Sequence, residues 1–174
     1  METNEKKLVE ISVVGEVASP RSSGHPFRIT PEGKPVVLPG LGGITYNVKV
    51  GDNAIQWEAD HVEPCVTVRN KDADENGALN LLACIGNTAK IITGDAKGET
   101  GAVTGKHGGI ENILVDFDDA TLDKLVIGDK IHIRGVGVGF ALARYPHITL
   151  LNMSPSLLKA MPIKEDKAKE ELHI

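Results

Sequence analysis

The stretch Ile-Ile-Thr-Gly-Asp-Ala-Lys-Gly-Glu-Thr-Gly-Ala-Val-Thr-Gly-Lys-His-Gly-Gly-Ile-Glu-Asn-Ile-Leu-Val-Asp-Phe, residues 91–117, decides the fold. A Gly-Asp-Ala-Lys-Gly turn and a glycine-rich loop separate three runs that contain β-branched side chains. Glycine permits positive φ at tight turns, and β-branched residues favour strands. This order of strand, turn, strand, loop and strand is the layout of a small barrel hairpin.

Short β-branched runs between turn signals continue on both sides of this stretch. We expect strands at 8–17, 44–50, 66–69, 88–94, 101–105, 111–117, 126–136 and 147–152, and one or two short strands within the loop-rich segment from Pro20 to Gly43. Capping residues predict short helices at 74–86 (cap Asp74), at 118–125 (cap Asp118 or Asp119) and from Ser154-Pro155 onward. Lys and Glu at helical spacing in 163–174 predict a frayed or partner-dependent helix in a charged tail.

These elements predict a mainly β protein, a barrel-like small lobe with extended loops and two or three short helices. We expect a single domain over 1–162, with the barrel-like hairpins at 88–136 as its sub-lobe. The chain has 174 residues, and six aromatic side chains leave the core to aliphatic ones. That length is enough to bury a sizeable apolar core.

The composition excludes several classes of protein. A formal charge of −5 does not call for nucleic acid or an anionic membrane, and no apolar run approaches the roughly 20 residues that cross a bilayer. We therefore expect a soluble, cytoplasmic protein. Cys65 and Cys84 are too few for a disulfide scaffold and are expected to be packed thiols.

The first candidate site lies in residues 57–65. If this segment is extended, His61 and Glu63 share one face, and Asp60 and Val62 share the other. A His and a carboxylate on one face can hold a divalent metal or form a base with its orienting partner, or they can be a simple ion pair at a strand edge. A third metal ligand would come from elsewhere: the candidates are His107, Asp95 and His25.

The second candidate site is the glycine-rich loop around Lys106 and His107. Successive backbone N–H groups at Gly105, Gly108 and Gly109 could bind an anion, with the lysine supplying charge and the histidine transferring a proton. The alternative is a hairpin tip with a solvated Lys and His.

Four further polar residues complete the candidate ligand-binding set. Asp95 and Lys97 belong to the turn that precedes this loop. Asn76 and Asn80 lie four residues apart and share a helix face, where they either contact a ligand or bond to a neighbouring loop.

Residues 91–117 resemble the KOW element of ribosomal and transcription-elongation proteins, with Lys97-Gly98, Gly101 and Val103 at matching positions. In that family the surrounding surface is basic and touches RNA. Here two lysines stand against four carboxylates. Because phosphate contacts supply most non-specific affinity for nucleic acid, this balance disfavours RNA.

Most of the chain resembles an uncharacterised family, the domain of unknown function 4438. The resemblance rests on 8–17, 39–47, 60–64, 75–80, 82–87, 94–98 and 104–109. It implies a mainly β fold built around a barrel-like lobe and no established activity. It also implies a longer C-terminus, so this chain is expected to be a natural short form, a fragment or one half of a split protein. We expect either a homo-oligomer or a partner chain that supplies the missing C-terminal half.

Two functions are consistent with these features. The first is a small-molecule-binding protein or enzyme with a polar pocket built from residues 60–63 and 94–109. There Lys106 would bind a carboxylate or phosphate, His107 would transfer a proton, and His61 with Glu63 would hold a metal or activate water. The second is a non-enzymatic assembly or protein-binding module that uses the KOW-like barrel.

Overall fold

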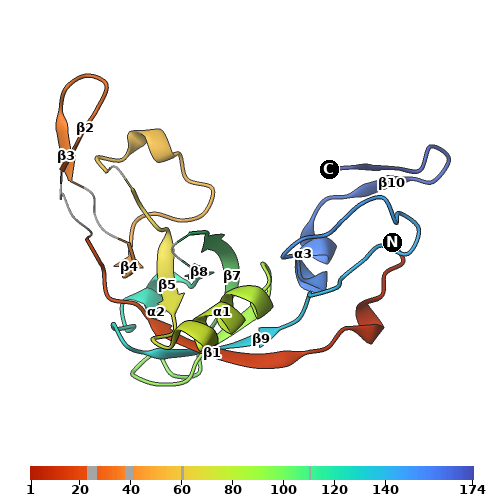
Figure 1. Ribbon diagram of the computed structural model, residues 1–174, viewed down its shortest axis with the longest axis horizontal. Helices are drawn as coiled ribbons and strands as arrows, with labels where there is room; N and C mark the ends of the chain where they lie inside the picture. Colours follow the sequence, from red (N-terminus) through yellow and green to blue (C-terminus); the bar gives the residue numbers. More distant parts are fainter. Residues whose placement is uncertain (23–26, 38–40, 60, 110) are drawn as a thin grey trace.

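A computed structural model describes residues 1–22, 27–37, 41–59, 61–109 and 111–174. Its centre is a closed, antiparallel β-barrel of six strands, in the order β1-β9-β6-β7-β8-β5, with β1 also paired to β5 (Figure 1). The barrel strands are β1 (Ile11–Val17), β5 (Cys65–Arg69), β6 (Thr88–Ile91), β7 (Thr100–His107), β8 (Asn112–Asp116) and β9 (Lys130–Gly135). The prediction of a mainly β, barrel-like fold is confirmed, and the barrel also takes β1 and β5, which lie outside 88–136.

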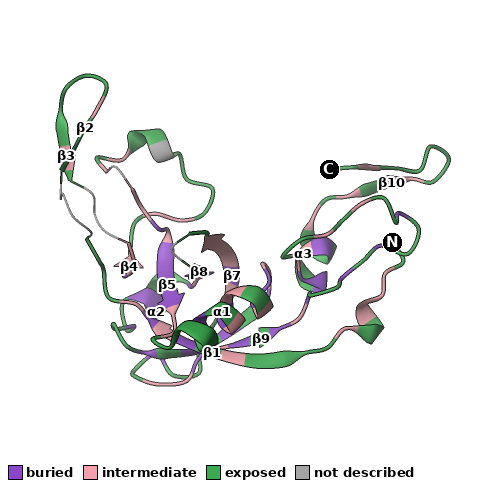
Figure 2. Cartoon of the chain, in the orientation of Figure 1, coloured by how far each residue is buried: buried purple, intermediate pink, exposed green. Residues whose placement is uncertain are grey.

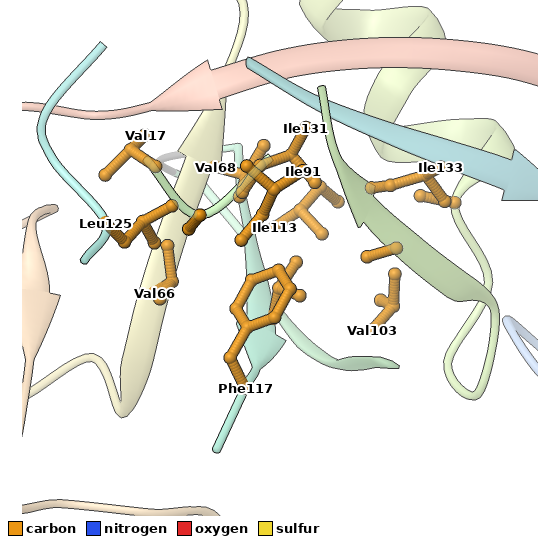
Figure 3. Packing of buried hydrophobic residues seen from close by; sticks show 14 of the residues in the cluster. Val17, Val66, Val68, Ile91, Val103, Ile113, Phe117, Leu125, Ile131 and Ile133 are labelled. Atoms are coloured by element: carbon orange, nitrogen blue, oxygen red, sulfur yellow. The ribbon is translucent and has the colours of Figure 1, made fainter. Parts of the chain in front are cut away.

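The barrel core is made almost entirely of aliphatic side chains that alternate along the strands. Val66 and Val68 of β5 are fully buried, as are Ile131 and Ile133 of β9, and Phe117 is the largest fully buried side chain. Figure 3 shows these residues packed against one another from different strands. Each such side chain stabilises the fold by about 1.5–3 kcal/mol through burial.

The remaining elements lie around the barrel. They are η1 (Glu5–Lys7), β2 (Phe27–Ile29), β3 (Pro35–Val37), β4 (Ile44–Thr45), η2 (Ala54–Gln56), α1 (Ala73–Leu82), α2 (Asp119–Leu122), α3 (Pro155–Ala160), β10 (Lys164–Asp166) and β11 (Glu171–His173). The β2–β3 hairpin projects on one side of the barrel, and α3 with the C-terminal segment lies on the other (Figure 1). A second apolar cluster, around Phe140, Leu142, Tyr145 and Leu158, stabilises that C-terminal side. No helix among the described residues has the length and apolarity to cross a membrane.

Three helix predictions are confirmed, although α1 and α2 have other bounds than expected. Asp118 caps α2 and Ser154 caps α3, as expected. The cap of α1 is Asp72, whose Oδ1 accepts from two backbone N–H groups, so the assignment to Asp74 is wrong. The helix also ends at Leu82, because Ala83 and Cys84 leave it to enter the core.

Three strand or helix expectations are wrong. Segment 163–174 forms the β10–β11 hairpin, not a helix, because Ile163 and Leu172 pack against the second apolar cluster. Residues 147–152 form no strand and make only an isolated bridge, Ala141 to Thr149. The strand expected at 44–50 is limited to the two residues of β4, since only these pair with β5.

Candidate functional site

The centre of the candidate site is Glu63, a buried carboxylate on the outer face of the barrel wall. One oxygen accepts hydrogen bonds from the backbone N of Gly42 and the Thr67 hydroxyl, both at 2.7 Å. The other accepts from Nδ1 of His107 and, at 2.9 Å, from Nδ2 of Asn112. Only 4% of Glu63 is exposed. Four hydrogen-bond donors therefore bind this single buried carboxylate.

A sharp bend in the chain brings Glu63 back over the strand that follows it. Residues four apart on an extended chain have Cα atoms about 13 Å apart, yet the side chains of Glu63 and Thr67 are hydrogen-bonded. The bend is at Pro64 and Cys65, and Cys65 has a φ of 56°, which is rare for a non-glycine residue. The Thr45 hydroxyl donates to the Glu63 carbonyl and holds the bend in place.

A β-bulge places His107 on the same outer face. The register of β7 against β8 shifts between Val103 and Gly105. Because side chains alternate along a strand, one extra residue exchanges the two faces. His107 consequently lies opposite Asn112 and reaches Glu63, whereas Lys106 lies opposite Ile113, a core residue.

The carboxylate of Glu63 determines which nitrogen of His107 is protonated. Burial raises the pKa of Glu63, but the bonds from Thr67, Asn112, His107 and Gly42 outweigh it and lower the pKa below 4.5. An ionised carboxylate only accepts hydrogen bonds, so Nδ1 of His107 carries the proton that faces it. In the neutral imidazole, Nε2 is then an acceptor that can take a proton or bind a metal.

His61 completes a three-residue cluster. Its ring stacks on that of His107, with centroids 4.6 Å apart and 21° between the planes. One ligand atom from each of His61, Glu63 and His107 lies within 4.8 Å of the others. Zinc bonds nitrogen at about 2.1 Å, so two of its tetrahedral ligands lie about 3.4 Å apart. One atom of each residue is therefore near the others, within 4.8 Å against about 3.4 Å between the ligands of a bound zinc ion.

The surroundings of Glu63 contain two polar atoms without partners. Oδ1 of Asn112 and Nε1 of Trp57 are buried and make no hydrogen bond among the described residues. Glu63 and Trp57 line one cavity of about 360 Å³, whose wall also includes Tyr46 and Glu58. Unsatisfied buried atoms are costly, and here one belongs to a hydrogen-bond donor of Glu63 and the other to a residue that lines the same cavity as Glu63.

The structure separates Lys106 from this cluster. Its Nζ donates to the backbone carbonyl of Asn80 and, at 2.8 Å, to Oδ1 of Asn152. Burial lowers the pKa of Lys106. Lys106 and His107 are adjacent in sequence but have different partners.

The two asparagines of α1 contact the loop after β7. Nδ2 of Asn76 and Nδ2 of Asn80 both donate to the carbonyl of Glu111, at 2.9 and 2.8 Å. Glu111 has a φ of 61° and immediately precedes Asn112. The two amides thus hold a strained backbone position next to the candidate site.

The other predicted residues lie away from Glu63. Asp95 and Lys97 are exposed in the turn before β7, at the opposite end of that strand from His107. Gly105 contacts Leu114 across the strands, and Gly108 and Gly109 form the exposed tip of the β7–β8 hairpin. The candidates His25 and Asp60 lie outside the described residues.

Sequence reasoning missed Gly42, Thr67 and Asn112. Thr67 carries a signal, because it is the one hydroxyl within the apolar run of β5 and is fully buried. Asn112 begins β8 with a buried amide. Neither residue identifies its partner: Glu63 is 49 residues from Asn112, and it meets the nearby Thr67 only through the bend at Cys65.

The chain matches a known protein family and is similar to a solved structure. The family model for the N-terminal part of the domain of unknown function 4438 (DUF4438) matches residues 27–159, so the chain belongs to this family. The crystal structure of TM1086 is similar over the whole chain, with a TM-score of 0.92 and 46% sequence identity. The chain spans 60% of the length of that protein. No curated protein matches the chain. The family resemblance is confirmed, and the KOW-like hairpin inside it stays a prediction.

Proposed function

We propose that this chain is an enzyme, or a binding protein for a small molecule, whose reacting group is Nε2 of His107. The observation that carries this proposal is the contact between His107 and Glu63. A buried, ionised carboxylate on Nδ1 fixes the ring, sets the tautomer and stabilises the imidazolium that forms when Nε2 takes a proton.

The arrangement around the pair supports a reaction more than a structural ion pair. A structural pair needs one partner for each charge, whereas Glu63 has four donors, and Nε2 of His107 has no hydrogen-bond partner among the described residues. The orphaned Oδ1 of Asn112 and Nε1 of Trp57 add polar atoms for a ligand. Such a site would abstract a proton from a bound substrate or water.

The second candidate for the same cluster is a divalent metal site. The proximity of ligand atoms on His61, Glu63 and His107 favours it. Since Glu63 is already saturated, the two histidines would bind the cation and Glu63 would orient His107 from behind. Metal-bound histidines commonly donate their second N–H to a carboxylate in this way.

Two measurements test the proton-transfer role and the metal-binding role of the cluster: NMR of the imidazole nitrogens and titration with zinc. In ¹⁵N-labelled protein at about pH 8, we expect His107 to be protonated at Nδ1, and we expect Glu63→Gln to shift the proton toward Nε2. Isothermal titration with zinc sulfate would show binding that weakens more than tenfold in His61→Ala and His107→Ala. His147→Ala, an exposed histidine away from the cluster, is the matched control. If the wild-type ring favours Nε2–H and zinc binding is unaffected by both variants, the proposal fails.

An assembly role has one specific observation in its favour. Phe27, Ile29 and Val37 of the β2–β3 hairpin are exposed by 53–68%, and most of the hairpin is green in Figure 2. An isolated two-stranded hairpin is marginally stable, so such a surface fits contact with another chain. Light scattering after size exclusion tests this role: we expect a mass above 18.5 kDa that Phe27→Ser reduces to the monomer.

A further inference from the structure

The groove beside the end of β5 has two arginines that find no carboxylate partner among the residues that the structure describes. A cavity of about 530 Å³ is lined by Glu16, Ala18, Ser19, Pro20, Arg21, Arg69, Asn70, Lys71, Ile127 and Gly128. An adjoining cavity of about 430 Å³ shares Glu16, Arg69, Asn70 and Lys71 with it. The shared residues make the two cavities parts of one groove, here called the β5 groove.

The acidic groups of the β5 groove are already engaged. Glu16 lies directly opposite Arg69 in the β1–β5 pair, but its carboxylate binds Nζ of Lys71 at 2.8 Å. Glu75 accepts from Nδ2 of Asn70, also at 2.8 Å. Within the part of the chain that the structure describes, no ion pair or hydrogen bond involves the guanidinium of Arg69 or Arg21.

Arg69 is also half-buried, which sets it apart from the exposed cations of the surface. A guanidinium is always charged and presents paired N–H donors that match a carboxylate or a phosphate. Solvent and salt screen a charge in the wall of a groove less than a charge on a convex surface, so the attraction of Arg69 for an anion is greater.

The β5 groove leads toward the Glu63–His107 pair. Thr67, which donates to Glu63, and Arg69 are two residues apart on β5 and leave the same face, about 7 Å from each other. Pro20 lines both the β5 groove and the cavity that contains Glu63.

We infer that the β5 groove binds the anionic group, a phosphate or a carboxylate, of a small ligand through Arg69 and Arg21. Anion binding itself needs only the β5 groove. The further step, that the bound anion directs the rest of the ligand toward His107, rests on the proposed function.

Calorimetric titration of the full chain with inorganic phosphate and, separately, with sodium acetate tests this inference. Sodium chloride keeps the ionic strength constant. We expect saturable binding of at least one anion, weakened at least fivefold in Arg69→Gln and at least twofold in Arg21→Gln. Tighter phosphate binding would indicate a phosphorylated ligand, and tighter acetate binding a carboxylic acid.

Two controls separate the possible failures. Arg144→Gln, an exposed arginine of the C-terminal side, should bind as the wild type does, and so should His107→Ala. Absence of saturable binding, equal binding by Arg69→Gln, or equal weakening in Arg144→Gln would overturn the inference. Because His107→Ala leaves the groove intact, anion binding can persist even if the proposed role of His107 is wrong.

Discussion

Replacing Glu63 by Gln tests most directly whether an ionised carboxylate at this position holds the site together. The carboxylate accepts from Gly42, Thr67, Asn112 and His107. In glutamine an NH2 group, which only donates, replaces one of the two oxygens, so the two donors that face it lose their acceptor, at a cost of about 1–3 kcal/mol for each buried group left unpaired. The lower desolvation cost of a neutral amide returns part of this loss. We therefore expect Glu63→Gln to reduce the free energy of unfolding by about 2–4 kcal/mol at neutral pH.

The pH dependence of that loss distinguishes the charge from the shape of the side chain. The folded-state pKa of Glu63 is lowered, so its contribution is complete above the unfolded pKa of about 4.5 and disappears as pH falls through the folded value. Urea unfolding should show a difference between wild type and Glu63→Gln that is largest at about pH 7 and shrinks at about pH 3.5. Glu58→Gln, an exposed glutamate of the same segment, should stay within about 0.5 kcal/mol of the wild type. An equal difference at both pH values, or one below about 0.5 kcal/mol at pH 7, would refute the reasoning.

Three further predictions concern the fold. Gly101→Ala should lower the free energy of unfolding by about 3 kcal/mol or more in thermal or urea unfolding, because the new Cβ would lie 2.0 Å from a backbone oxygen of β8. Gly77→Ala is the matched control: its Cβ would have no atom within 4 Å, so it should stabilise α1 by about 0.5–1 kcal/mol. Burial, and then a bond to a carboxylate, raises the pKa of Cys65 to about 12, and burial raises that of Cys84, so a disulfide reagent at about pH 8 should modify neither thiol before unfolding. Asn76→Ala removes a donor to the Glu111 carbonyl and should speed amide exchange at the tip of the β7–β8 hairpin, an effect that unchanged exchange rates would contradict.

The barrel could be predicted from local patterns because each of its strands carries its own signal. In β9, for example, Ile131 and Ile133 alternate with polar residues, and Gly-Asp precedes the strand at the turn. Such period-two patterns report burial on one face without any knowledge of the neighbouring strand. Helix caps are equally local, which is why Asp118 and Ser154 were identifiable.

The C-terminal side could not be predicted in the same way, since its structure depends on distant contacts. Charged pairs at helical spacing favour a helix by only about 0.2–0.5 kcal/mol each. Burying Leu172 against the second apolar cluster, and the bond from the Tyr145 hydroxyl to Glu165, favour the hairpin instead. Neither contact can be inferred from the residues of the tail alone, because each needs a partner outside the tail.

The candidate site was half predictable. His61, Glu63 and His107 stand out as titratable groups in short segments flanked by glycine or proline, and the structure brings all three together. The expected route, an extended strand with His61 and Glu63 on one face, differs from the structure, in which residues 61–64 form no strand. The cluster instead results from the bend at Cys65.

The β7 bulge decides which of two adjacent residues joins Glu63. In an unbroken strand, His107 would share a face with Val103 and point into the core, and Lys106 would point outward. The bulge at Thr104 reverses this assignment, so Lys106 contacts Asn80 and Asn152 while His107 meets the carboxylate. A glycine at position 105 indicates that a bulge is permitted there, yet the choice of face depends on the pairing with β8. A cationic Lys106 opposite Glu63 would make a permanent ion pair, whereas the histidine there keeps a second ring nitrogen, Nε2, that can accept a proton or bind a metal, and this property makes the cluster suited to chemistry.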